Sequence, residues 1–423
     1  MSARAGGFAS SERRLSHAEA IALLKALAIP ARPSERVGVF EATGRVSAET
    51  VFAPRPIPAH ANAAVDGYAF AFASYDAERG RLLSLAGRAA AGAPSPTAAR
   101  PGSAVRVFTG AVMPEGCDTV AMQEDCRLEA GGVFVAAGLE KGANRRFAGE
   151  DMAEGAAVIA PSRRLRPQDL AALAASGRDA VACVRRPRVC VFSTGDEVLA
   201  PGASFAPGKV YDANGPMLAG LFAPLTLTAR YGGVLPDHRE AVDEALRAAA
   251  LDNDLVVVSG GASLGQEDHV VAALSRAGAL SLWRLAIKPG RPMAVGEMGG
   301  CLCFALPGNP VAAMICALLY VWPVARRLSG EPWIEPRRLF LPAGFEILSR
   351  KPGRREFFRG WIEGAGEQAA ARKYPRDGSG LISSLRAASG LIEIPEEVEA
   401  IREGDRVAFI PFAEYGILPA DSP

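Results

Sequence analysis

The chain has 423 residues, of which 49% are hydrophobic and 22% are charged. This length exceeds what one hydrophobic core usually organises, so we expect a folded protein of about two to four domains. The 47 basic residues nearly cancel the 46 acidic residues, which excludes a global field that favours nucleic acid or an anionic membrane. Any anion must therefore be bound by a local site.

The cysteines and the start of the chain indicate a cellular compartment. The seven cysteines form an odd set without a CxxC pair, so they predict neither a disulfide framework nor a zinc site. Residues 1–20 lack the apolar core of a signal peptide, and no stretch reaches the roughly 18 uncharged apolar residues of a membrane helix. We therefore expect a cytoplasmic protein that does not enter a membrane.

The first predicted element is a short amphipathic helix that begins after Ser16 and ends before Pro30. Ser16 is followed three residues later by Glu19, which is the pattern of a capping box. A second helix is predicted over residues 166–177, with a proline near its start and a glycine at its end. We assign both helices to one elongated N-terminal or linker domain, formed by residues 10–50 and 152–185.

The remaining segments differ in periodicity. Residues 51–151 contain short strands that are interrupted by proline and glycine, which predicts an inserted β-rich domain. Residues 186–331 alternate apolar strands with helical segments, which predicts a central wound, mostly parallel α/β domain. Residues 332–423 lose the helical periodicity, and their alternating segments predict a C-terminal β-barrel-like domain. The expected fold is a multidomain α/β and β protein.

Three Gly-rich loops follow apolar strands of the α/β segment, at residues 191–197, 256–269 and 304–310. In a wound sheet, ligands bind where such carboxyl-terminal loops converge, and glycine lets backbone amides approach an anion. Glycine also serves tight strand-to-helix turns, which is the commoner role of any one such loop. Three loops together favour a site for a phosphate-bearing ligand, although none matches the usual triphosphate or dinucleotide motif.

Acidic residues accompany these loops. They are Asp196, Glu197, Asp212, Asp237, Glu267 and Asp268. Mg²⁺ requires hard oxygen ligands, usually one or two carboxylates with water and substrate phosphate. A Mg²⁺ phosphate site is one interpretation. Capping of the following helix is the alternative for each acid, and Asp268 is an obvious candidate for such a cap.

Two cations flank a Pro-Gly turn in LAIKPGRPMAVG, residues 285–296. Lys288 as a point charge and Arg291 as a fork would suit a tetrahedral oxyanion. The chain has only six lysines, at positions 25, 141, 209, 288, 351 and 373. Two solvated charges on a surface turn are the alternative interpretation.

Taken together, these motifs resemble the molybdopterin molybdenumtransferase family, which includes the MoeA proteins and the carboxyl-terminal enzyme domain of gephyrin. The matching stretches run in family order from about residue 15 to 415. They are NAAVDGYAF, FTGAVMPEGCDTVAMQED, GANRRFAGEDM, VFSTGDEV, VYDANG, VVVSGGASLGQEDH, LWRLAIKPGRPMAVG and FALPGNP. Their number makes the match specific, whereas any one of them alone would be weak.

The resemblance implies a reaction and an assembly. Adenylylated molybdopterin and molybdate would give molybdenum cofactor and AMP, with a divalent cation such as Mg²⁺. The protein would be a four-domain elongated homodimer, with the active site between the α/β domain of one subunit and the inserted domain of the other. A molybdopterin adenylyltransferase would deliver the substrate in a transient contact.

The resemblance also implies roles for individual residues. The catalytic set is Asp66, Thr109, Asp151, Glu197, Asp237 and Asp268, of which Glu197, Asp237 and Asp268 would bind the metal. The molybdate-binding set is Lys288, Pro289, Arg291, Arg354, Arg359, Ser379 and Ser384. The substrate-binding set is Ser193, Thr194, Gly195, Ser259, Gly260, Gly261, Pro307, Gly308 and Asn309.

Several positions depart from the family pattern. Arg291 stands where a lysine is frequent, and Ala312 replaces a common serine, so the oxyanion pocket keeps its charge but loses a hydroxyl donor. The alternatives to molybdate insertion are a paralogue that inserts tungstate or adenylylates molybdopterin, and a noncatalytic dimeric scaffold of the same fold. The carboxylates around the Gly-rich loops argue against a pure scaffold.

Overall fold

The structure is a computed structural model that describes residues 14–262, 269–277 and 280–418. The chain divides into two compact units. Unit 1 contains Met1–Glu35, Gly44–Ala48 and Cys183–Pro423, and unit 2 contains Arg36–Thr43 and Glu49–Ala182. The four-domain division expected from the sequence stays a prediction.

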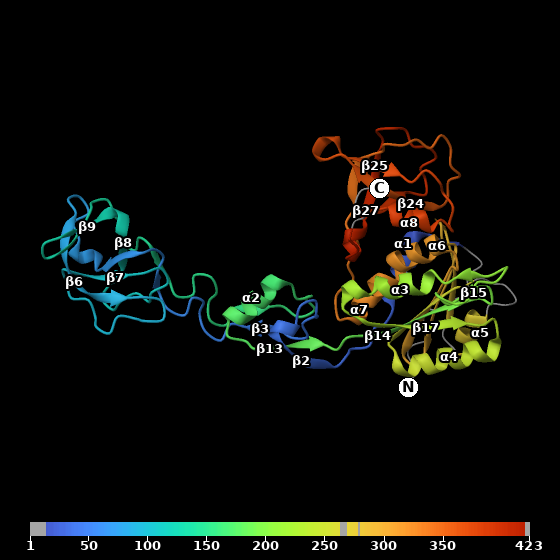
Figure 1. The fold of residues 1–423 in the computed structure, drawn as a ribbon, viewed down its shortest axis with the longest axis horizontal. Helices are drawn as coiled ribbons and strands as arrows, with labels where there is room; N and C mark the ends of the chain where they lie inside the picture. Colours follow the sequence, from blue (N-terminus) through green and yellow to red (C-terminus); the bar gives the residue numbers. More distant parts are fainter. Residues whose placement is uncertain (1–13, 263–268, 278–279, 419–423) are drawn as a thin grey trace. The chain divides into compact units, whose positions relative to one another are not determined.

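The centre of unit 1 is a wound sheet (Figure 1). Among the described residues it has seven strands, in the order β1 (Arg14–Leu15), β19 (Leu280–Leu285), β21 (Pro292–Met298), β22 (Cys301–Leu306), β18 (Leu255–Ser259), β14 (Arg188–Thr194) and β17 (Thr228–Leu235). Neighbouring strands from β22 to β17 pair in parallel, and β21 is antiparallel to β19 and β22. The predicted mostly parallel sheet is confirmed.

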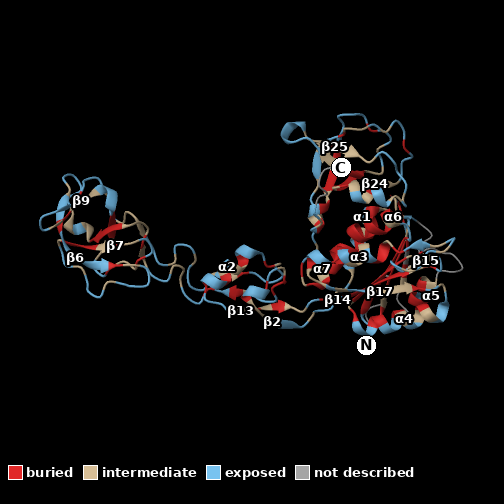
Figure 2. Cartoon of the chain, viewed as in Figure 1, coloured by how far each residue is buried: buried red, intermediate tan, exposed pale blue. Residues whose placement is uncertain are grey.

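Both faces of this sheet are covered, which explains the continuous apolar strands. In β14, Val189 and Val191 belong to one buried cluster, and Cys190 and Phe192 belong to the other. The first cluster includes residues of α1 (His17–Ala26), α3 (Asn214–Leu221), α6 (Pro310–Cys316) and α7 (Trp322–Leu328). The second includes residues of α4 (Arg239–Asp252) and α5 (His269–Arg276). Figure 2 shows this buried interior in red.

The helix from Pro310 to Leu328 runs through α6, the π-helical turn η5 (Ala317–Val321) and α7. By length and composition alone it could cross a membrane, although the sequence analysis expected no such segment. Within the unit, however, 89% of its most apolar window is buried. A helix that is apolar on all sides is expected in the core of a large protein as well as in a bilayer.

The last part of unit 1 is a second sheet. Its described strands are β20 (Ile287–Lys288), β24 (Arg355–Glu363), β26 (Gly390–Ile394), β27 (Arg406–Pro411) and β23 (Leu339–Pro342), with β25 (Ala370–Lys373) paired to β24. The helix α8 (Ile382–Ala387) packs against β24. Because β20 belongs to the α/β segment and pairs in parallel with β24, this pairing joins the two sheets.

The two predicted helices belong to different units. The capping box of α1 is present, since the Ser16 hydroxyl accepts from Glu19 N and the Glu19 carboxylate accepts from Ser16 N. Ala20 and Leu24 of α1 pack in the main core of unit 1. The helix α2 (Pro167–Ala175) lies in unit 2. The sequence analysis placed both in one domain.

Unit 2 is rich in short strands, as the Pro and Gly spacing predicted. Its main sheet has, among the described residues, β8 (Thr119–Met122), β5 (Gly67–Phe70), β7 (Ser103–Val107), β6 (Arg81–Ala89), β10 (Gly132–Val135) and β9 (Cys126–Glu129) in that order. The unit also contains two short pairs, β4 (Asn62–Ala63) with β11 (Arg145–Arg146) and β3 (Val51–Phe52) with β12 (Ala157–Ile159).

Candidate functional site

The Gly-rich loops converge at the carboxyl ends of the parallel strands. Ser193 near the end of β14 is in register with Ser259 at the end of β18, and Ser259 is in register with Leu306 at the end of β22. A cleft of about 590 Å³ opens there. Its lining includes Ser193, Thr194, Glu197, Asp212, Asn214, Ser259, Gly308, Asn309 and Ile382. We call it the strand-end cleft.

The strand-end cleft lies where ligands usually bind in a wound sheet. The chain runs from β14 outward to β17 on one side and returns to β18 on the other. The connections therefore diverge at the carboxyl end of β14, which is the topological switch point of the sheet. The predicted convergence of the loops was correct, although only residues 256–262 and 269 of the second loop are described.

Asp212 is a buried structural acid in the floor of this cleft. One carboxylate oxygen accepts from the Ser193 hydroxyl at 2.8 Å and from the backbone N–H groups of Asn214 and Gly215 at 3.0 Å each. The other accepts from the Tyr231 hydroxyl at 2.6 Å. Asp212 thus satisfies the first N–H groups of α3, which is the helix-capping role that the sequence analysis kept as an alternative.

Asn214 was not predicted as a site residue, yet it ties two of the loops together. Its side-chain amide N–H₂ donates to the Ser259 hydroxyl and to the Gly308 carbonyl, both at 2.7 Å. The Gly308 carbonyl can only accept, so it determines which end of the amide faces it. Asn214 is 9% exposed, and the structure gives its side-chain oxygen no partner.

Glu197 and Asp237, two of the three acids proposed as metal ligands, lie in neighbouring loops, which backbone hydrogen bonds of Asp196 and Asp237 join. Asp196 N donates to an Asp237 carboxylate oxygen at 3.2 Å, and Asp237 N donates to an Asp196 carboxylate oxygen at 3.0 Å. The carboxylate of Glu197 folds against Gly195, where a Cβ atom would lie within 2.7 Å of three of its atoms. Asp268 lies outside the described residues.

This donor set fits a loosely held Mg²⁺. Within the described part of the chain, no group of three or more His, Cys, Asp or Glu side chains converges into a cage. Mg²⁺ does not need such a cage, because it keeps several waters and binds through one or two carboxylates and the phosphates of a substrate. The exposed Asp196, the half-buried Asp237 and the cleft-lining Glu197 offer the oxygen type that this ion prefers.

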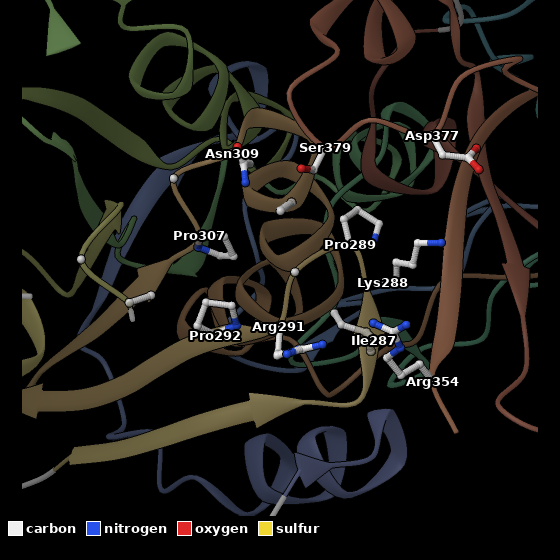
Figure 3. A pocket seen from close by; sticks show the side chains of 15 residues that line it. Ile287, Lys288, Pro289, Arg291, Pro292, Pro307, Asn309, Arg354, Asp377 and Ser379 are labelled. Carbon is white, nitrogen blue, oxygen red and sulfur yellow. The ribbon is translucent and has the colours of Figure 1, made fainter. Parts of the chain in front are cut away.

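A second cleft, of about 490 Å³, lies between the Lys288–Arg291 turn and the last part of the chain (Figure 3). Among the described residues that line it, three are cationic: Lys288, Arg291 and Arg354. The remaining lining includes Gly261, Pro289, Pro307, Gly308, Asn309, Ala312, Asp377 and Ser379. We call it the cationic cleft. Figure 3 shows Asn309 and Ser379 toward one end and Arg291 and Arg354 toward the other.

The turn that carries the cations is closely packed. Gly290 has a φ of +106°, and a Cβ atom there would lie 2.6 Å from Cys316 Sγ, so this position requires glycine. The Lys288–Pro289 peptide bond is cis. Lys288 Nζ lies 3.4 Å from the buried carboxylate of Glu356, and no acidic side chain within the described ranges forms an ion pair with Arg291 or Arg354.

The two clefts adjoin. Gly308 and Asn309 line both of them. The segment 377–382 also borders both, because Asp377 and Ser379 line the cationic cleft and Gly380 and Ile382 line the strand-end cleft. A ligand could therefore extend from one cleft into the other along this shared wall.

Two residues expected to bind molybdate do not line the cationic cleft. Arg359 is 2% exposed and donates to the Ser384 hydroxyl at 3.0 Å and to the Arg376 and Gly378 carbonyls at 3.2 and 3.3 Å. Ser384 is fully buried. Burial lowers the pKa of Arg359. Arg359, oriented by Ser384, thus binds the backbone of residues 376–378, which immediately precede Ser379.

The other predicted residues divide between the clefts. Ser193, Thr194 and Ser259 line the strand-end cleft, and Pro289, Gly261 and Pro307 line the cationic cleft. Gly195 and Gly260 line neither cleft, but their missing side chains leave the space that Glu197 and Thr194, respectively, occupy. Asp377, which the sequence analysis missed, adds an acid to the cationic cleft, but Lys373 Nζ pairs with it at 2.6 Å.

Unit 2 brings two of its three predicted residues into contact. The backbone N–H and the hydroxyl of Thr109 both donate to one Asp66 carboxylate oxygen at 2.8 Å. These hydrogen bonds lower the pKa of Asp66, so the carboxylate is ionised over the neutral range. Asp151 is exposed, and its backbone N–H donates to the Ile57 carbonyl at 3.1 Å.

Models of known families match three consecutive stretches of the chain. The MoeA N-terminal region (domain I and II) matches residues 15–177, a probable molybdopterin binding domain matches residues 190–327, and the MoeA C-terminal region (domain IV) matches residues 346–412.

Relatives match the chain over nearly its whole length. A molybdopterin molybdenumtransferase of Haemophilus influenzae is 34% identical over 394 residues, which are 92% of this chain and 96% of the relative. Molybdopterin molybdenumtransferase 1 of Mycobacterium tuberculosis is 30% identical, over 93% of this chain and 98% of the relative. The crystal structure of the molybdopterin biosynthesis MoeA protein from Pyrococcus horikosii superposes with a TM-score of 0.81 at 28% identity, covering 95% of this chain and 99% of that one.

Proposed function

Since this chain belongs to the molybdopterin molybdenumtransferase family and is therefore a transferase of molybdenum cofactor biosynthesis, we propose that it inserts molybdate into adenylylated molybdopterin and releases AMP. One observation carries the proposal. A cleft lined by Lys288, Arg291 and Arg354 adjoins the Gly-rich strand-end cleft along Gly308 and Asn309.

The cationic cleft suits molybdate as a substrate. Molybdate is a tetrahedral dianion, and the three cations exceed the one acid, Asp377, whose charge Lys373 already balances. The two guanidinium groups can donate paired hydrogen bonds in one plane, whereas the ammonium acts as a point charge. Ala312 in the lining supplies no hydroxyl, so anion binding here depends on the cations and on Ser379.

The strand-end cleft suits the phosphate-bearing substrate. Glycines allow the backbone of the Gly308–Asn309 turn to approach an anion closely. The Ser193 and Ser259 hydroxyls are already engaged with Asp212 and Asn214, so the floor of the cleft is rigid before a substrate arrives. Rigid donors at a binding site reduce the reorganisation needed during reaction.

Mg²⁺ would be held by Glu197 and Asp237, with Asp268 as the third expected ligand, and would offset negative charge on the departing phosphate when bound. As the two dithiolene thiols bind molybdenum, one oxo group of molybdate leaves as water with the two thiol protons, and a water molecule adds to phosphorus as the P–O bond to AMP breaks. Lys288, Arg291 and Arg354 would hold the anion against the sulfurs and balance its charge. No residue of the chain needs to form a covalent intermediate.

The proposal includes a homodimer in which Asp66, Thr109 and Asp151 complete the site. The Asp66–Thr109 contact supports a role for this pair, because two hydrogen bonds to one oxygen fix the orientation of the carboxylate. Mixed dimers of Asp66→Ala and Lys288→Ala chains would regain part of the activity if the two residues come from different subunits. We also propose that an adenylyltransferase delivers the substrate and that the protein acts in the cytoplasm.

The proposal is tested by measuring AMP release from adenylylated molybdopterin with Mg²⁺ and molybdate, for the full chain and for Lys288→Ala. We expect molybdate-dependent turnover that falls at least about tenfold in the variant, as for loss of one electrostatic contact to a reacting anion. Lys351→Ala is the matched control, because Lys351 is exposed and lines neither cleft. AMP release that does not depend on molybdate would contradict the proposal, and so would turnover of Lys288→Ala equal to that of the unsubstituted chain.

A further inference from the structure

Glu356 contacts the lysine of the cationic cleft from the side of the second sheet. The parallel pairing of β20 with β24 sets Lys288 opposite Glu356, and Lys288 Nζ lies 3.4 Å from a Glu356 carboxylate oxygen. The Glu356 side chain is 4% exposed, whereas that of Lys288 is 44% exposed. The pair thus joins a fixed, buried anion to a long side chain at the edge of the cleft.

Arg350 lies on the other side of the Glu356 carboxylate. Its Nε is 3.8 Å from the second carboxylate oxygen, and its side chain is also 4% exposed. The guanidinium donates instead to three carbonyls, those of Pro395, Val398 and Arg354. Arg350 therefore balances the charge of Glu356 without using the oxygen that faces Lys288, and it also holds the backbone of Arg354, another cation of the cleft.

A buried glutamate is costly at this position in a sheet. The two residues that follow it in the strand, Phe357 and Phe358, are buried and apolar, and an apolar residue at 356 would avoid the desolvation of a carboxylate. Free lysine side chains sample many rotamers, so an ammonium at the cleft edge would spend much of its time in solvent. A carboxylate behind it restrains that motion.

We propose that Glu356 is a positioning residue that holds the Lys288 ammonium at the wall of the cationic cleft. An ammonium has three N–H donors, and the single long contact to Glu356 leaves the others for an oxyanion. The nature of that anion, molybdate, rests on the proposed function. The placement of Lys288 by Glu356 does not.

Glu356→Gln separates positioning from simple charge balance. The substitution keeps the shape of the side chain and removes its charge, which leaves the cleft more positive. If Glu356 merely competes with the anion for Lys288, the variant binds molybdate more tightly. If Glu356 positions Lys288, the variant binds molybdate more weakly, by about threefold, as expected for loss of a partly exposed ion pair. Glu356→Asp, which keeps the charge, should recover part of the affinity.

Glu393→Gln is the matched control. Glu393 lies on the neighbouring strand β26 and is equally buried, but its ion-pair partners are Arg338 and Arg355, neither of which lines the cationic cleft. A loss of affinity that reflects only a damaged sheet would occur in both glutamine variants. Molybdate affinity of each full-length variant is measured by titration calorimetry with molybdate alone.

A second measurement does not depend on any anion. The chain has only six lysines, so the acylation rate of each can be followed by peptide mapping with the others as internal standards. We expect Lys288 to react about threefold faster in Glu356→Gln, because its ammonium has lost the restraining charge, and at an unchanged rate in Glu393→Gln. Unchanged Lys288 reactivity, or tighter molybdate binding, overturns the inference. Faster Lys288 reactivity in a protein that binds no molybdate would support the placement and contradict the proposed function alone.

Discussion

Substitution of Arg359 by Met tests whether this residue binds an anion or supports the cleft. The methionine keeps most of the apolar stem and removes the guanidinium, which donates three hydrogen bonds from a site that is 2% exposed. Each is worth about 1 kcal/mol net. Within the described part of the chain Arg359 forms no ion pair, so removal of its buried charge recovers some desolvation energy. We expect the free energy of unfolding to fall by about 2 kcal/mol.

The assay is urea unfolding of the full chain together with molybdate binding. Arg386→Met is the control, because Arg386 is an exposed arginine on the adjacent α8. If Arg359 supports the cleft, Arg359→Met loses stability, and molybdate binding weakens only indirectly, because the segment around Ser379 becomes less ordered. Unchanged stability combined with abolished molybdate binding would refute this reasoning and would restore Arg359 as a direct anion ligand.

Three further outcomes are expected. Burial lowers the pKa of His17 to about 4, so the unfolded chain binds a proton more readily than the folded chain. The free energy of unfolding should therefore be highest above about pH 6.5 and should fall by about 3 kcal/mol as the pH drops toward 4. His17→Leu should flatten this dependence when unfolding is measured at each pH. Thr109→Val removes the hydroxyl donor and keeps the backbone N–H, so it should raise the pKa of Asp66 part of the way back, seen by NMR titration of the carboxyl; an unchanged value would show that the hydroxyl does not contribute to the lowered pKa. Gly195→Ala should displace the Glu197 carboxylate, since Gly195 has a φ of +129° and the added Cβ would lie 2.5 Å from a Glu197 carboxylate oxygen. Turnover should then fall. Full activity of this variant at every Mg²⁺ concentration would count against Glu197 as a ligand.

The local patterns of the sequence were sufficient to predict several elements. The Ser16–Glu19 spacing determines the start of α1, because a capping box needs only residues within one turn. The alternation of apolar strands and helices predicted the wound sheet, and the Gly-rich loops predicted where its ligand cleft opens. These features depend on short-range periodicity and on a general rule of parallel sheets, so a single sequence contains them.

Other features depend on contacts between distant segments. Lys288 and Arg291 could be recognised as a cationic turn, and the family resemblance placed Arg354 and Ser379 in the same anion-binding set. The residues alone do not give that grouping, because it depends on the pairing of β20 with β24, which brings the last part of the chain to the turn. The motif around Arg359 resembles that of an anion ligand, yet packing buries its side chain beneath the 376–378 backbone. Asn214 stands in the quoted VYDANG stretch, but its role could not be predicted, because its two partners come from loops 45 and 94 residues away.

The sequence by itself determined which segments become strands and helices, where the glycine loops stand and which family the motifs resemble, since each of these follows from neighbouring residues. Only the tertiary structure decided which charged side chains face a cleft and which support it from behind. Exposure and hydrogen bonding depend on the strands and loops that pack around a residue, and those partners lie far away in the chain.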